Sequence, residues 1–124
     1  MDNATSLSLA RIAVGAAAYA VPERSLKAMM LDHTHHEAPF LMRIFGIRDL
    51  ALGVATLLAR PEHKPALVRL GMLVDAGDAG AGALALRAHA VKPALGAVLT
   101  GVPASAVVAG LVALGQQKRK RKKV

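Results

Sequence analysis

Charged side chains interrupt the apolar segments of this chain, and they are the residues whose types could do chemistry. The run from Phe40 to Ala59 is long enough to cross a bilayer, yet Arg48 and Asp49 lie side by side near its middle. An ionisable residue at bilayer depth costs roughly 2.5–3.5 kcal/mol on insertion scales, so it usually faces the interior of a helix bundle and has a partner there. The next apolar segment offers such partners, because it carries Asp75 and Asp78.

Glycines accompany these carboxylates at helical spacing. Positions three and four residues apart share one face of a helix. This spacing gives two stripes, Gly71, Asp75, Asp78 and Gly82 on the later segment and Gly46, Asp49 and Gly53 on the earlier one. Because small residues let helix backbones approach closely in lipid, we expect the two stripes to meet and to bring their carboxylates together near mid-bilayer.

Arginines available to these carboxylates lie within or beside the same apolar segments. They are Arg11, Arg43 and Arg48. We expect Arg11 or Arg48 to pair with Asp75 or Asp78. One interpretation is a structural network that fixes which helices pack together. The other is a site that binds a proton or a ligand, because two carboxylates three residues apart repel each other and one is then more readily protonated.

Four apolar segments must position these groups, and they define the predicted fold. Of the 124 residues, 54% are hydrophobic and 19% are charged, whereas soluble domains carry about 25% charged residues. The segments run from about 6–21, 40–59, 66–86 and 93–114, and at about 1.5 Å per residue the last three can span a bilayer core of roughly 30 Å. We predict an all-α, polytopic membrane protein with four antiparallel transmembrane helices in residues 1–117 and a basic tail at 118–124.

The first segment is the shortest, and Arg11 interrupts it. It either spans, continues for a turn past Pro22, or lies tilted near one surface. A cleaved signal peptide is an alternative, because Ala18-Tyr19-Ala20 resembles a cleavage site. The first ten residues contain no Lys or Arg, however, which argues against a signal peptide.

Basic residues in the loops indicate the orientation. Arg60, Lys64 and the basic tail fall on one side, whereas Arg24, Lys27, Arg87 and Lys92 fall on the other. We predict a multi-pass protein of the plasma (inner) membrane with both termini in the cytoplasm. The long loop from Pro22 to Pro39 would then lie outside, where its Ser25–Leu31 portion could form one or two helical turns on the surface.

The basic tail supplies six of the positive charges in a chain of net charge +8. Its residues are Lys118, Arg119, Lys120, Arg121, Lys122 and Lys123. Such a run also occurs in nucleic-acid-binding proteins. Directly after an apolar segment it favours binding to anionic lipid head groups instead, at about 1 kcal/mol per basic residue. We expect the lipid bilayer and other membrane subunits as partners, and no nucleic acid.

Other sites of chemistry have weaker support. His33, His35 and His36 lie among acids in the outer loop, but their spacing matches no established metal-ligand pattern, so they are only weak metal candidates. Gly80 to Ala85 fits a dinucleotide-binding pattern in letters, yet it lies in an apolar helix with no preceding strand. No Cys and no nucleophile–base constellation are present, so we expect no cofactor, no resident metal and no catalytic residue.

The run from Arg43 to Gly53, followed by Asp75 and Asp78, resembles an uncharacterised family of small four-helix membrane proteins from actinobacteria. Its members carry an R-x-x-G-x-R-D-x-x-L-G pattern in the second helix and an acidic residue in the third. The likeness covers roughly residues 7 to 115. It implies a four-helix membrane fold and no particular activity. Its shared core would be Arg43, Gly46, Arg48, Asp49, Gly53 and Asp78.

Three functions fit these features. The first is a non-enzymatic accessory or structural subunit of a homo- or hetero-oligomer, because Gly- and Ala-rich faces suit helix association. The second is a small-solute or proton transporter in which Asp49, Asp75 and Asp78 titrate. The third is a membrane enzyme or binding protein that acts on a lipid or a quinone. We expect a protein that is not an enzyme, because no nucleophile, metal cage or cofactor motif supports the third.

Overall fold

The computed structural model describes residues 3–29, 31, 35–89 and 92–123, and within them the chain is helical without strands. The helices are α1 (Asn3–Ala20), α2 (Pro22–Ala28), α3 (Ala38–Leu58), α4 (Lys64–Arg87) and α5 (Pro93–Lys122). The predicted all-α class is confirmed. Each predicted apolar segment coincides with one of the four long helices, and α5 continues through most of the basic tail.

Prolines mark where the later helices begin. Pro22, Pro39, Pro65 and Pro93 each occupy one of the first two positions of a helix, where the missing N–H group would have had no partner in the helix. Pro22 also separates α1 from α2, and the two are bent by 119°. The first segment therefore ends at Ala20, and the helical turns expected in the following loop are α2.

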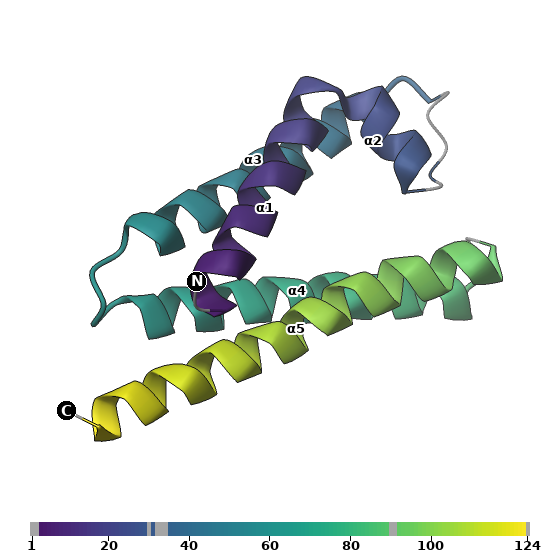
Figure 1. The fold of residues 1–124 in the computed structure, drawn as a ribbon. Helices are drawn as coiled ribbons and strands as arrows, with labels where there is room; N and C mark the ends of the chain where they lie inside the picture. Colours follow the sequence, from purple (N-terminus) through teal and green to yellow (C-terminus); the bar gives the residue numbers. More distant parts are fainter. Residues whose placement is uncertain (1–2, 30, 32–34, 90–91, 124) are drawn as a thin grey trace.

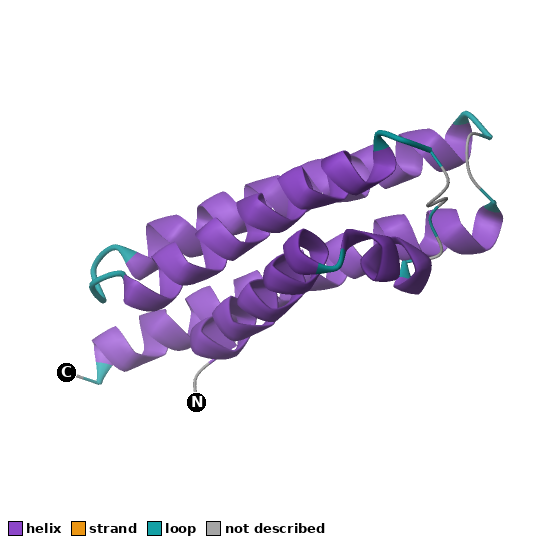
Figure 2. Ribbon diagram, turned by 90° about the horizontal axis from the view of Figure 1, so that it is seen from above, coloured by secondary structure: helices purple, strands orange, loops and turns teal. Residues whose placement is uncertain are grey.

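The long helices form two pairs, as Figures 1 and 2 show. α1 packs along α3, and α4 packs along α5, while α3 and α4 have little direct contact. The pairs meet where the start of α1 reaches α5, with Ala4, Val68 and Ala113 in a small apolar core. They diverge toward α2, beneath which a second core contains Leu26 and Met42.

Glycines allow close approach of α1 and α3. A Cβ atom on Gly46 would lie 2.7 Å from both the carbonyl oxygen of Gly15 and the backbone nitrogen of Tyr19. A Cβ on Gly15 would lie 2.6 Å from the carbonyl oxygen of Gly46. Because the opposing atoms are backbone, any larger side chain at either position would push the helices apart.

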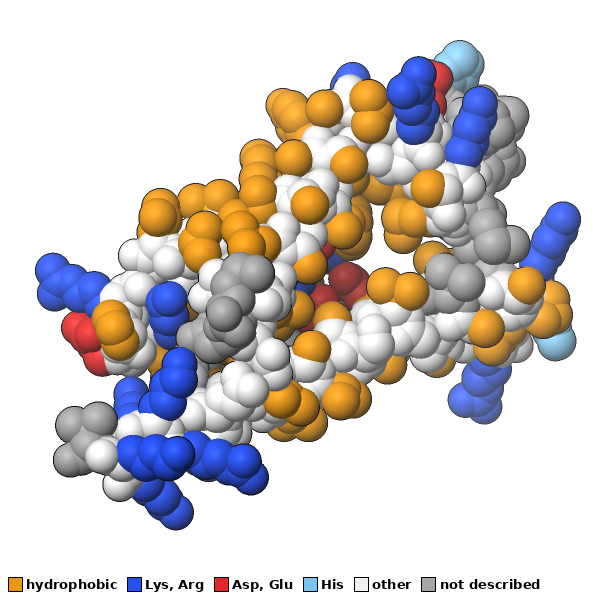
Figure 3. All heavy atoms as spheres, viewed as in Figure 1, with side chains coloured by type: hydrophobic (Ala, Val, Ile, Leu, Met, Phe, Trp, Pro, Cys, Tyr) orange, Lys and Arg blue, Asp and Glu red, His pale blue; other side chains and the backbone are white. Residues whose placement is uncertain are grey.

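Several polar side chains are buried, and many large apolar side chains are exposed. Buried positions include Ser8, Arg11, Asp49, Thr56 and Asp75. Large apolar side chains lie exposed along all four long helices, and Figure 3 shows them over the outer faces. Examples are Val14, Phe40, Ile44, Leu73, Leu84, Val102 and Leu111. Such extensive apolar surface is typical of proteins that contact lipid or partner chains.

Length and composition identify one helical stretch of the described residues, Leu99–Lys122, as able to cross a membrane by itself. The bent pair α1 and α2 meets the same criterion when taken together. α3 and α4 do not meet it on their own. Both contain several ionisable side chains among their apolar residues, so neither helix taken alone is apolar enough to cross a membrane by this criterion.

Candidate functional site

Arg11 lies at the centre of a buried network that joins three helices. From α1, its Nη1 donates a hydrogen bond of 2.9 Å to Oδ1 of Asp49 on α3. Its Nη2 donates to Oδ2 of Asp75 on α4. The residues are only 8%, 8% and 5% exposed, respectively. We call Arg11, Asp49 and Asp75 the buried triad.

Two glycines make the space that the buried triad occupies. A Cβ atom on Gly71 would lie 3.0 Å from Nη2 of Arg11, so this glycine accommodates the guanidinium group. A Cβ on Gly53 would lie 3.1 Å from the Cβ of Arg11 and 2.8 Å from the carbonyl oxygen of Ser8. Glycines therefore make room for a long cationic side chain that reaches from α1 to both α3 and α4.

Arg48 and Asp78 form a second ion pair, closer to the surface. The two Nη atoms of Arg48 donate to the two carboxylate oxygens of Asp78, at 3.3 and 2.7 Å. The guanidinium carbon also lies 5.0 Å from the centre of the Phe45 ring, within range of a cation–π interaction. About one third of each charged side chain is exposed. The pair thus connects α3 to α4 while remaining accessible from outside.

Adjacent residues on α3 serve the two pairs separately. Side chains of consecutive helical residues point about 100° apart. Asp49 faces α1 and the buried triad, whereas Arg48 faces α4. In this way one Arg-Asp dipeptide connects α3 to both neighbouring helices.

The charges of this network do not balance. The buried triad contains one guanidinium group and two carboxyl groups, and the Arg48–Asp78 pair is balanced. Five ionisable groups therefore carry a net charge of −1 if all are ionised. Figure 3 shows a hollow between the diverging helix pairs, with acidic side chains at its base.

The structure brings together all but one residue of the polar network that the sequence suggested. Two of the expected pairs form, Arg11 with Asp75 and Arg48 with Asp78. Asp49 joins the network by pairing with Arg11. Arg43 lies apart, because five residues of helix turn it about 140° away from Arg48. It is exposed, and its Nε donates to the carbonyl oxygen of Tyr19 at 3.2 Å.

The expectation that the two glycine stripes meet each other is wrong. Gly46 and Gly53 face the backbone of α1, because α3 packs along α1 and has little direct contact with α4. Gly82 instead faces α5, where an added Cβ would lie 2.7 Å from the carbonyl oxygen of Leu99. Gly71 packs against a side chain, not a helix backbone.

Apart from Arg11, the α1 face that contacts these residues was not predicted from the sequence. It consists of Ala4, Ser8, Arg11, Gly15 and Ala18, all buried. The alternating spacing of four and three residues, with small residues around one arginine, is the signal that could have identified it. The hydroxyl of Ser8 donates to the carbonyl oxygen of Ala4 at 2.8 Å, which satisfies it within its own helix.

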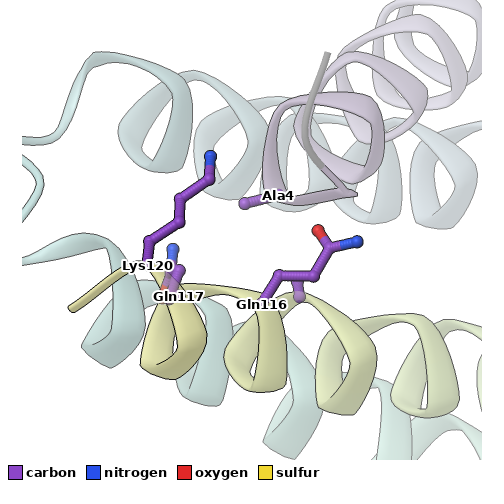
Figure 4. A pocket seen from close by; sticks show the side chains of 5 residues that line it. Ala4, Gln116, Gln117 and Lys120 are labelled. Atoms are coloured by element: carbon purple, nitrogen blue, oxygen red, sulfur yellow. The ribbon is translucent and has the colours of Figure 1, made fainter. Parts of the chain in front are cut away.

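The remaining candidates give no second site. His35 and His36 are exposed, His33 lies outside the described residues, and no group of three metal-ligating side chains occurs among residues that the structure places. A narrow pocket between the start of α1 and the end of α5 is lined by Ala4, Ala113, Gln116, Gln117 and Lys120 (Figure 4). At this pocket the backbone N–H of Asn3 donates a hydrogen bond to Oε1 of Gln116 at 3.3 Å, which links α1 to α5.

Comparisons with known proteins add no relative. No family model matches the chain, and neither curated proteins nor solved structures include a significant match. The resemblance to an actinobacterial family stays a prediction. The function of the protein must therefore be inferred from the arrangement of its own residues.

Proposed function

We propose that this protein is a small integral membrane protein, a non-enzymatic accessory or structural subunit whose four long helices cross the bilayer. The observation that supports it best is that charged side chains are buried while many large apolar side chains are exposed. Arg11, Asp49 and Asp75 are buried, whereas Leu73, Val108 and similar side chains are exposed. In water, both the buried charges and the exposed apolar side chains would be unfavourable. In a bilayer, lipid covers the apolar side chains, and the charges are paired inside the protein.

Ion pairing explains why α3 and α4 can cross a bilayer although neither is apolar enough alone. Their central charges pair with Arg11 or with each other, although about one third of the Arg48 and Asp78 side chains stays exposed. Ionisable residues in transmembrane bundles are typically paired in this way. The same pairing makes each helix dependent on its neighbours, which is the behaviour expected of a structural network.

The ends of the molecule support a common side for both termini. Residues near the two termini contact each other through Asn3 and Gln116, and the connection between α3 and α4 lies at the same end in Figure 1. Arg60 and the basic tail belong to this end. We place this end in the cytoplasm, where the tail binds anionic lipid head groups. α2 then lies on the opposite surface of the membrane.

Extraction of membranes tests the membrane part of this proposal. We expect the protein to remain in the membrane pellet after washing with alkaline carbonate and to be released by detergent. Release by carbonate alone would show a peripheral protein and contradict the proposal.

Native mass spectrometry tests the subunit role. In mild detergent we expect an assembly with a mass above that of the 12.8 kDa chain, containing either further copies or a stoichiometric partner. The broad exposed apolar faces of all four long helices are the reason. A 12.8 kDa monomer that binds only lipid would contradict a subunit role.

A proton or small-solute transporter is the second candidate. It is favoured by the exposure of the Arg48–Asp78 pair, because a group that exchanges protons needs access to water. This function predicts that Asp78→Asn abolishes proton flux into liposomes while the protein still folds. Equal flux through the Asp78→Asn variant and the unaltered protein would exclude Asp78 from such a pathway.

A further inference from the structure

We propose that an open pocket at the bend between α1 and α2 binds the phosphate group of an anionic phospholipid through Arg24 and Arg43. The proposal deepens the proposed function and rests on it, because a lipid head group lies beside this pocket only if the long helices cross a bilayer. The basic tail lies at the other end of the molecule, so the pocket is a separate site (Figure 1).

The bend of 119° between α1 and α2 creates one wall of the pocket. This wall consists of Ala20 to Arg24, and Pro39 and Arg43 near the start of α3 complete the lining. The pocket has a volume of about 340 Å³, near the lower end of the roughly 300–1,000 Å³ typical of ligand pockets. This space has room for a phosphate group and its glycerol, whereas the acyl chains of a lipid must lie outside it.

The charges of the lining favour a ligand with a single negative charge. The guanidinium groups of Arg24 and Arg43 and the carboxylate of Glu23 give two positive charges and one negative charge. Among the described residues, neither arginine forms an ion pair with a carboxylate. A phosphodiester carries one negative charge, and its two free oxygens match the paired N–H groups of an arginine. Such a group would therefore neutralise the pocket.

Arg43 is restrained at the pocket in a way that leaves part of its guanidinium group available. Its Nε donates to the carbonyl oxygen of Tyr19 at 3.2 Å, whereas its Nη atoms make no hydrogen bond to the described residues. These Nη groups can donate to a phosphate oxygen while the bond to Tyr19 is kept. A side chain that is already restrained loses less conformational entropy when it binds a ligand.

An apolar strip leads away from the pocket along α3. Ile47 and Val54 follow Arg43 by four and eleven residues, so the three residues share one face of the helix. The two apolar side chains are 48% and 37% exposed, and they lie deeper in the bilayer in the proposed orientation. A lipid whose phosphate binds at Arg43 can place an acyl chain along this strip. A soluble phosphate would leave the strip uncovered, so the structure favours a lipid as the source of the phosphate.

Native mass spectrometry of the full chain in a maltoside detergent tests the pocket, because the populations of lipid-bound protein give dissociation constants. The delipidated protein would be titrated with phosphatidylglycerol, which has one negative charge, or with phosphatidylcholine, in which a cation balances the same phosphodiester. We expect phosphatidylglycerol to bind more tightly. Equal binding of the two lipids would overturn the proposal.

Variants locate the binding site. Arg24→Gln and Arg43→Gln should each weaken phosphatidylglycerol binding roughly tenfold or more, because each removes charged donors from the phosphate. Lys27→Gln is the matched control, since Lys27 is an exposed basic residue of α2 that does not line the pocket. The basic tail is the same in all these chains and cannot produce a difference between them. Unchanged binding in both arginine variants, or an equal loss in Lys27→Gln, would overturn the proposal.

The Arg24→Gln variant keeps the test valid if Arg43→Gln disturbs the packing of α3. Arg24 is exposed on α2, so its replacement should leave the helix contacts intact. Circular dichroism of each variant in the same detergent would check that the helix content is unchanged.

Competition distinguishes a lipid from a soluble phosphate. Glycerophosphoglycerol, the same head group without acyl chains, should not displace phosphatidylglycerol at equal concentration. Displacement would show that the pocket recognises the head group alone and would overturn the assignment to a lipid. Carbonate extraction tests the membrane proposal separately. A chain that stays in the membrane pellet but binds both lipids equally would contradict the pocket and leave the proposed function intact.

Discussion

At the scale of single residues, Arg11 determines how the helices are held together. It is buried, and both ends of its guanidinium group bind carboxylates from different helices. Apolar packing can stabilise a protein as well as a buried ionic network does, but breaking such a network by removing one partner is costly. The asymmetry makes Arg11 the most informative residue to change.

Arg11→Gln should destabilise the protein severely. The substitution leaves Asp49 and Asp75 buried without a counter-charge, and loss of one partner from a buried pair costs about 3–5 kcal/mol. Thermal unfolding in detergent, followed by circular dichroism, would measure the loss. Arg69→Gln is the matched control, because Arg69 is exposed on α4. Equal melting temperatures for the two variants would contradict the role of Arg11.

At the scale of elements, glycine positions decide which helices approach. Gly46 lies against the backbone of α1, whereas a Cβ on Gly77 of α4 would meet nothing within 4 Å. Both residues are glycines in the interior of a long helix, so they differ only in what surrounds them. They therefore separate the packing role of glycine from its low helix propensity.

Gly46→Ala and Gly77→Ala should change stability in opposite directions. At Gly46 the added methyl group collides with backbone atoms 2.7 Å away, so the α1–α3 contact must open and the melting temperature should fall. At Gly77 the space is open, and alanine is favoured over glycine in a helix by about 1 kcal/mol. Melting of both variants in the same detergent measures the difference. If the melting temperature fell equally in both variants, close α1–α3 contact would not be the reason for glycine at position 46.

The sequence predicts the helices well and their packing poorly. Long apolar runs and prolines at helix starts locate the four long helices, because these are local signals. The charge at Asp49, Asp75 and Asp78 identifies the polar site for the same reason. The partners of Gly46 and Gly53 depend on α3 packing along α1 and not along α4, and nothing in the local sequence of α3 specifies that choice.

At the scale of the whole molecule, charged and apolar residues occupy different regions, both along the helices and around them. Charged residues gather at the two ends and in the interior, and apolar residues cover the outer faces, as Figure 3 shows for one side. The basic end of α5 extends the helix beyond its apolar part. Such a distribution is typical of integral membrane proteins.

Replacement of the six basic tail residues by Gln should weaken binding to anionic membranes. Each basic residue near an anionic surface contributes about 1 kcal/mol, and salt screens the attraction. A peptide of residues 116–124 and its Gln counterpart, titrated with vesicles containing or lacking phosphatidylserine, would measure the effect. Binding that depends neither on the basic residues nor on the anionic lipid would contradict this role.

The accessibility of single cysteines would show whether the exposed apolar faces contact lipid. The chain has no native Cys, so Leu73→Cys on α4, Val108→Cys on α5 and Glu62→Cys in the connecting loop each introduce a unique thiol. Leu73 and Val108 are 71% and 60% exposed in the structure. In unsealed native membranes, a charged maleimide should label Glu62→Cys but neither helix variant until detergent and denaturant are added. Rapid labelling of Leu73→Cys and Val108→Cys in those membranes would show that water, and not lipid, covers these faces, and would contradict a transmembrane position of α4 and α5.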